Sequence, residues 1–102
     1  MNIKYVDENW LKEEIKNAIG KHLSTGDYKI FFFGSRVKGN NFERSDIDIG
    51  IQGPKPIDAE TKLEIEDELD NIPTLYIFDL ADFGRTPERF KLLTDKDIEY
   101  IN

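Results

Sequence analysis

The apolar residues between positions 7 and 24 recur three or four positions apart, which is the spacing of an amphipathic helix. Asp7 is placed to cap the first turn, and Gly26 lies beyond the last one. The residues of the apolar stripe are Trp10, Leu11, Ile15, Ala18, Ile19 and Leu23. The pattern therefore predicts a helix over 7–24 that packs one face on the rest of the protein.

Two strands are predicted after this helix. Residues 28–33 are an aromatic and branched run that ends at Gly34-Ser35, which is typical of a buried strand followed by a tight turn. Residues 46–51 alternate, with isoleucine at 47, 49 and 51 on one side and Asp46, Asp48 and Gly50 on the other. A period of two with this division indicates a strand that buries one face.

The rest of the chain predicts further alternation of helices and strands. We expect a helix over 58–71, a strand over 75–80, a helix beginning at Thr86-Pro87, and a short helical turn and loop over 36–45. Residues 97–101 are too short to assign. The side chains expected to face inward from the two later helices are Leu63, Leu69, Ile72, Phe90, Leu92 and Leu93. This order predicts an α/β (α+β) fold with a small mixed sheet of three or four strands, flanked by helices.

Length and composition narrow the classes of function. A chain of 102 residues is expected to form one domain over 1–102. It has no cysteine and one histidine, which excludes disulfide frameworks, thiolate zinc sites and sites with two imidazoles. Fourteen basic against 21 acidic residues argue against binding to duplex nucleic acid. No apolar run is long enough to cross a membrane and the N-terminus lacks a signal peptide, so we expect a cytoplasmic protein.

The alternating strand carries the first candidate chemistry. Asp46 and Asp48 point to the same face with α-carbons about 6.5 to 7 Å apart, and carboxylate oxygens favour magnesium or manganese. Asp79 interrupts another apolar strand and joins the pair if the two strands are neighbours. Three carboxylates beside a phosphate-binding turn are the parts of a two-metal site for phosphoryl or nucleotidyl transfer.

The turn after residues 28–33 carries the second candidate chemistry, which is phosphate binding. Gly34 permits a close backbone approach, and the hydroxyl and amides of Ser35 suit an anion. Arg36, Lys38 and Arg44 follow in the same connection and suit phosphate, although solvated surface charges explain them equally well. The connection lacks the glycines of a dinucleotide fingerprint and the Gly-Lys-Ser/Thr of a Walker loop.

Together these segments resemble the DNA polymerase β-like nucleotidyltransferase superfamily. The segment Phe33-Gly34-Ser35-Arg36-Val37-Lys38-Gly39 is followed by Asp46-Ile47-Asp48, with ten residues between Ser35 and Asp46. The segment 78–83, with the sequence FDLADF, resembles the later strand that supplies the third carboxylate. The resemblance covers roughly residues 7–101, and the short chain is similar to the minimal nucleotidyltransferases, the MNT family.

The resemblance implies a role for each matching residue. Gly34 and Ser35 would hold the terminal phosphates of ATP. Asp46 and Asp48 would bind two magnesium ions, and Asp79 would bind one of them and help to deprotonate the acceptor hydroxyl. Asp82 is the alternative third carboxylate, although strand parity favours Asp79. Otherwise Asp82 is expected to cap a helix or lie on the surface.

The resemblance also implies a partner. Larger members add a domain that holds the acceptor, whereas members of this size are typically encoded beside a helical HEPN-domain protein. In that pair the transferase is the antitoxin, and it transfers AMP to a tyrosine of the RNA-cleaving toxin. Two alternatives remain open: an antitoxin that neutralises its partner by binding alone, and transfer to a small-molecule hydroxyl. The base specificity, the acceptor and the formation of a homo-oligomer also remain open.

Overall fold

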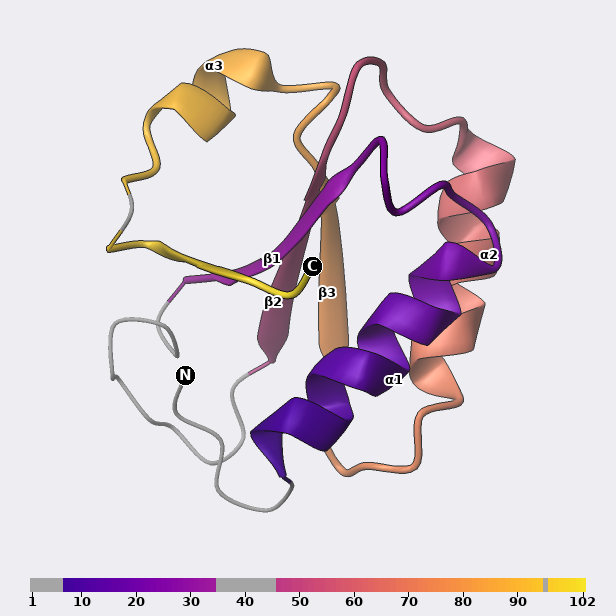
Figure 1. Ribbon diagram of the computed structural model, residues 1–102. Helices are drawn as coiled ribbons and strands as arrows, with labels where there is room; N and C mark the ends of the chain where they lie inside the picture. Colours follow the sequence, from indigo (N-terminus) through magenta and orange to yellow (C-terminus); the bar gives the residue numbers. More distant parts are fainter. Residues whose placement is uncertain (1–6, 35–45, 95) are drawn as a thin grey trace.

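The computed structural model describes residues 7–34, 46–94 and 96–102, which form a four-stranded mixed sheet and three helices (Figure 1). In chain order the elements are α1 (Glu8–Gly20), β1 (Lys29–Phe33), β2 (Ile47–Gln52), α2 (Ala59–Asp70), β3 (Phe78–Asp82), α3 (Pro87–Lys91) and β4 (Ile98–Tyr100). The strand order is β3-β2-β1-β4; β3 is parallel to β2, and the other pairs are antiparallel. The predicted class, a small mixed sheet flanked by helices, is confirmed.

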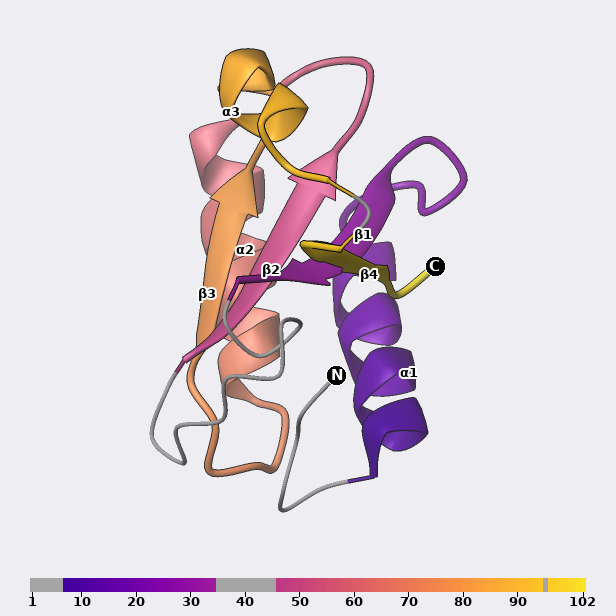
Figure 2. The ribbon, with the colours of Figure 1, turned by 90° about the vertical axis from the view of Figure 1, so that its left-hand side faces the viewer.

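The two long helices cover one face of the sheet, and α3 lies over the other (Figures 1 and 2). The main core fills the space under α1 and α2. There the isoleucines at 47, 49 and 51 meet the apolar stripe of α1, as the alternation along β2 predicts. The two long helices begin at aspartate caps: Asp7 accepts a hydrogen bond from the amide of Trp10, and Asp58 accepts one from that of Thr61.

A smaller aromatic cluster occupies the opposite face. Phe31, Phe33 and Phe83 are buried there, and Phe90 of α3 packs against them. This confirms that Phe90 faces inward, as predicted. Gly50 lets the rings approach β2 closely, because a Cβ there would collide with Cε2 of Phe31 and come within 2.8 Å of Cε2 of Phe83.

Several predicted boundaries and inward faces are wrong. The first helix ends at Gly20, so Leu23 packs on the core from the connection that follows. Leu63 is 66% exposed, and Ile65 takes the buried position on α2. Leu92 is also exposed, because α3 is a single short helix that ends at Lys91.

The third strand begins three residues later than the sequence predicts. Leu75 is 93% exposed and Ile77 is also exposed, so the predicted strand start is not a buried run. Pairing with β2 sets the true register, with Phe78 opposite Ile47. The unassigned segment near the C-terminus forms β4, which pairs with β1 through residues 98–100. In both places pairing with a neighbouring strand defines the element.

Within the described ranges, no helix is both long and apolar enough to cross a membrane.

Candidate active site

Strand pairing brings the three predicted carboxylates to one region of the sheet. Asp48 on β2 and Asp79 on β3 are directly paired in the parallel register. Asp46 precedes Asp48 by two positions, so both aspartates belong to the sheet face that the two long helices leave open. We predicted that Asp79 joins this pair if the two strands are neighbours, and the pairing of β2 with β3 confirms that they are.

The electrostatics of this region favour a bound cation. Burial raises the pKa of the Asp48 carboxyl, and the carboxylates of Asp79 and Asp46 raise it further. The positive charge of Arg89 on α3 acts in the opposite direction and lowers this pKa. The carboxylates thus repel one another, and a cation between them would relieve the repulsion.

The donor set suits magnesium, although the protein does not form a complete cage. In the described part of the chain, no three carboxylate, imidazole or thiolate groups converge closely enough to hold a metal ion by themselves. Magnesium in nucleotide enzymes is commonly bound by one or two carboxylates, with waters and substrate phosphates as the other ligands. The pair Asp48 and Asp79, with Asp46 near it, fits that partial set.

Gly34 lies directly against this carboxylate group. Its φ is +90°, a conformation that L side chains rarely adopt, and a Cβ at this position would collide with the Oδ2 atom of Asp48. Both the backbone and the space therefore require glycine where β1 ends. The other residues predicted to contact phosphate, Ser35, Arg36 and Lys38, lie outside the described residues, as does Arg44.

Asp82 has a different environment from Asp79. Its carboxylate accepts hydrogen bonds from the backbone amides of Ile57, at 3.0 Å, and Gly84, at 2.9 Å, and Nε of Arg85 lies 3.5 Å away. The side chain is only 3% exposed. The expectation that Asp82 caps a helix or lies on the surface is therefore wrong. Asp82 is a buried group that joins the α2 entry loop to the end of β3, and the structure places Asp79 beside Asp48 instead.

Arg89 is a charged residue near the site that the sequence did not single out. Its guanidinium carbon lies 5.2 Å from the ring centroid of Phe83 and 5.8 Å from that of Phe33. Phe33 is the β1 residue paired with Asp48, which explains why Arg89 influences that carboxyl. No local pattern identifies Arg89, because its position depends on how the short helix α3 packs over the aromatic cluster.

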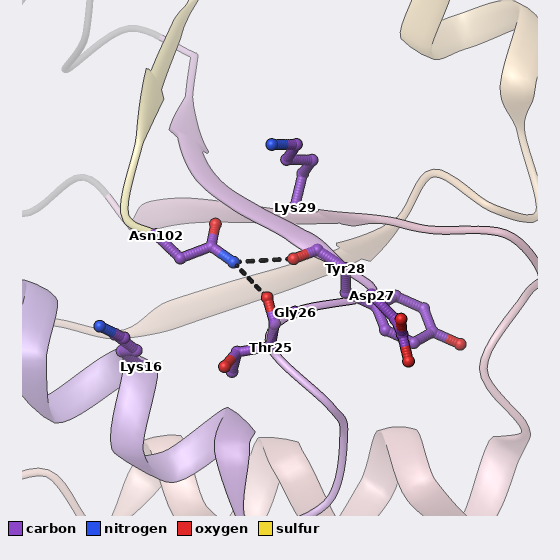
Figure 3. Close-up of a pocket in the computed structure, with 7 residues that line it drawn as sticks. All are labelled: Lys16, Thr25, Gly26, Asp27, Tyr28, Lys29 and Asn102. Carbon is purple, nitrogen blue, oxygen red and sulfur yellow. Dashed lines mark hydrogen bonds between the residues drawn. The ribbon is translucent and has the colours of Figure 1, made fainter.

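A cavity with a volume of about 330 Å³ lies at the start of β1, away from the carboxylates (Figure 3). Its lining residues are Lys16, Thr25, Gly26, Asp27, Tyr28, Lys29 and Asn102. The side-chain nitrogen of Asn102 donates to the carbonyls of Thr25 and Tyr28, and its oxygen accepts from the amide of Ile30. These contacts attach the C-terminal segment to β1. The cavity lies at the Lys29 end of this strand, whereas the carboxylates adjoin the Phe33 end, four residues further along.

The fold and the grouped carboxylates define a nucleotidyltransferase-type domain, and comparison with known families agrees. Residues 13–99 match the family described as polymerase beta, nucleotidyltransferase. The chain therefore belongs to this nucleotidyltransferase family, and the predicted family is confirmed.

Two particular proteins are similar to the chain. A protein of Haemophilus influenzae named "Probable protein adenylyltransferase MntA" is 31% identical over 70 residues, which are 69% of this chain and 61% of that protein. The match thus spans less than two thirds of the relative's length. The structure also resembles a chain in the "Crystal structure of the toxin-antitoxin with AMP-PNP", with a TM-score of 0.71 and 19% identity over 89% of this chain and 72% of that one. At 19% identity, the similarity to this crystal structure shows a shared fold alone.

Proposed function

We propose that the protein is a magnesium-dependent protein adenylyltransferase that acts as the antitoxin of a toxin-antitoxin pair. It transfers AMP from ATP to the hydroxyl of a tyrosine on a HEPN-domain toxin. The observation that carries the proposal is the direct pairing of Asp48 with Asp79 on one sheet face, with Asp46 near them and Gly34 against Asp48. A cytoplasmic location, where ATP is available, accompanies this proposal.

The chemistry requires one bond to form and one to break. The acceptor oxygen attacks the α-phosphorus, the bond from that phosphorus to the bridging oxygen breaks, and pyrophosphate leaves with the electron pair. Asp79 is the exposed member of the carboxylate pair and takes the hydroxyl proton. Gly34, with Ser35, Arg36 and Lys38, holds the phosphates.

The metal would be held chiefly by Asp46 and Asp48, with Asp79 completing the carboxylate set. Two magnesium ions, when bound, would supply positive charge to the attacking and leaving oxygens. The chain's own contribution is the placement of these side chains on adjacent strands. That placement holds them together despite the repulsion that raises the pKa of Asp48.

The named relatives support the acceptor class. One is named as a probable protein adenylyltransferase, and the other belongs to a toxin-antitoxin complex with an ATP analogue. The tyrosine acceptor and the HEPN-domain partner come from the sequence resemblance. Transfer to a protein is therefore favoured over transfer to a small molecule.

Label transfer tests the proposal. The protein, magnesium, and the product of the neighbouring reading frame are incubated with ATP labelled at the α-phosphate and, in parallel, with ATP labelled at the γ-phosphate. We expect the partner to gain only the α-label. The double variant Asp46→Asn/Asp48→Asn and the single variant Asp79→Asn should lose about 100-fold or more of the rate. Asp67→Asn is the matched control, since it removes an exposed carboxylate from α2 on the other side of the sheet.

Two results would contradict transfer. If the double aspartate variant labels the partner as fast as the wild type, the carboxylates are not catalytic. If that variant labels nothing but still silences the toxin in cells, neutralisation occurs by binding alone. Labelling of a small-molecule hydroxyl instead of the partner would identify the remaining alternative.

A further inference from the structure

Arg89 on α3 lies beside the strand position that adjoins the carboxylate pair. Its guanidinium lies over the rings of Phe83 and of Phe33, and Phe33 is the β1 residue paired with Asp48. The proposed function assigns Arg89 no task.

The aromatic cluster gives Arg89 a fixed support. Phe83 is fully buried and Phe33 nearly so, and their rings meet edge to face at 5.1 Å. Phe90, the next residue on α3, packs on Phe31 and Phe83 and anchors the helix. A guanidinium stacked on such rings keeps its hydrogen-bond donors directed away from the ring faces. The side chain is thereby restrained without consuming its donors.

Those donors are not used within the described residues. The recorded contacts of Arg89 there are the two ring contacts, and none is an ion pair with a carboxylate. Arg85, four positions earlier, differs: its Nη2 donates to the carbonyl of Ile57 at 2.7 Å, and its Nε lies near Asp82. One arginine of this segment therefore stabilises the fold, while the other presents its donors beside the candidate active site.

We propose that Arg89 binds the terminal phosphates of the nucleotide, the part that leaves as pyrophosphate. This rests on the proposed function, because it requires a nucleoside triphosphate in the carboxylate site. An arginine fork matches phosphate oxygens, remains charged at every working pH, and stabilises the negative charge that the pyrophosphate gains as the bond to the α-phosphorus breaks.

The consequence is selectivity for a triphosphate over a monophosphate. AMP lacks the β- and γ-phosphates, so it has nothing for Arg89 to bind. Loss of Arg89 should weaken ATP binding and leave AMP binding nearly unchanged. A purely structural arginine would affect both ligands equally, through the shape of the site.

Calorimetric titration of the full chain with ATP and with AMP, in magnesium and without an acceptor, tests this. Arg89→Met retains a long apolar side chain over Phe33 and Phe83, so the helix keeps its packing. We expect its Kd for ATP to rise about 10- to 100-fold and its Kd for AMP to change less than about twofold. Arg89→Lys, which keeps the charge and loses the fork, should lie between the two. Lys91→Met is the matched control on the same helix and should bind both nucleotides as the wild type does.

The failures of the two proposals can be told apart. If the wild type binds ATP and Arg89→Met binds it equally well, or loses ATP and AMP affinity to the same extent, Arg89 does not bind the terminal phosphates and the proposed function is untouched. If Arg89→Met unfolds, as a thermal melt would show, the binding ratio of Arg89→Lys decides in its place. If the wild type binds no ATP, the proposed function and this inference fall together.

Discussion

Replacing Asp82 with alanine is expected to destabilise the fold, whereas the same change at Asp79 is expected to spare the fold and remove the activity. The two aspartates are three residues apart on β3, Asp79 near its start and Asp82 at its end, yet their surroundings differ completely. Asp82 is buried and accepts two backbone hydrogen bonds, while Asp79 is exposed and paired with Asp48.

The magnitude for Asp82 follows from its contacts. A hydrogen bond to a charged group contributes about 1.5 to 3 kcal/mol. Two such bonds give an upper range of about 3 to 6 kcal/mol, but the amide of Gly84 is only partly buried and can be rehydrated. The amide of Ile57 is buried and would lose its partner. We therefore expect a loss of about 2 to 4 kcal/mol in the free energy of unfolding, or about 10 to 25 °C in Tm for a domain of this size.

Urea denaturation followed by far-UV circular dichroism measures the first effect, and label transfer to the partner measures the second. Asp79→Ala should unfold within about 0.5 kcal/mol of the wild type, because its side chain is exposed. Asp82→Asn should also be destabilised, since its amide NH₂ cannot accept a hydrogen bond from a backbone amide.

The reasoning is refuted if the pattern is reversed. An Asp82→Ala variant as stable as the wild type would mean that its two amide contacts contribute nothing. An Asp79→Ala variant that transfers label at the normal rate would mean that the third carboxylate lies elsewhere. Either result would reopen the choice between the two residues.

Four further predictions concern the sheet and the start of helix α2. Burial and neighbouring carboxylates raise the pKa of Asp48 in the folded state, so ionised Asp48 lowers the free energy of unfolding at neutral pH, and this loss disappears as the pH falls to the ordinary pKa of an aspartate, near 4. Asp48→Asn should therefore be more stable than the wild type at pH 7. A difference in stability that grows in acid would contradict this. Magnesium chloride should raise the Tm of the wild type more than that of Asp48→Asn, and equal shifts in a thermal melt would argue against a cation at this carboxylate. Gly50→Ala should cost about 1 to 3 kcal/mol in urea titrations, because the new Cβ collides with the ring of Phe31, and an unchanged midpoint would show that the ring can move at no cost. Asp58→Ala should lose about 1 kcal/mol by the same measurement through loss of the cap on Thr61, against no change for Asp67→Asn.

Local patterns predicted much of this molecule. The alternation over 46–51 predicted which side of β2 is buried, and that side carries three fully buried isoleucines. The position of Asp7 predicted the start of α1, and its carboxylate does cap the helix. Gly34 was predicted to follow the end of the buried strand over 28–33, and β1 does end at Phe33, with a φ of +90° at Gly34. Each of these depends on residues near one another in the chain.

The errors arose where distant contacts decide. The start of β3 was predicted from its apolar run, but the run includes exposed Leu75 and Ile77, and the strand begins where pairing with β2 begins. Leu63 was predicted to face inward, but the packing of α2 on the sheet buries Ile65 instead. β4 has too few residues to be recognised alone and exists because β1 offers it an edge.

Residue types and their spacing were enough to predict the chemistry available to this protein: three aspartates, a glycine turn and a fold able to present them. Those features depend on residue type and on spacing along one strand, which short-range geometry controls. Strand parity favoured Asp79 over Asp82, but it took the strand register to pair Asp79 with Asp48, and the packing of α3 to bring Arg89 over Phe33, the β1 partner of Asp48. Strand register and helix packing depend on contacts between segments far apart in the chain, and these contacts bring the separate charges into one site.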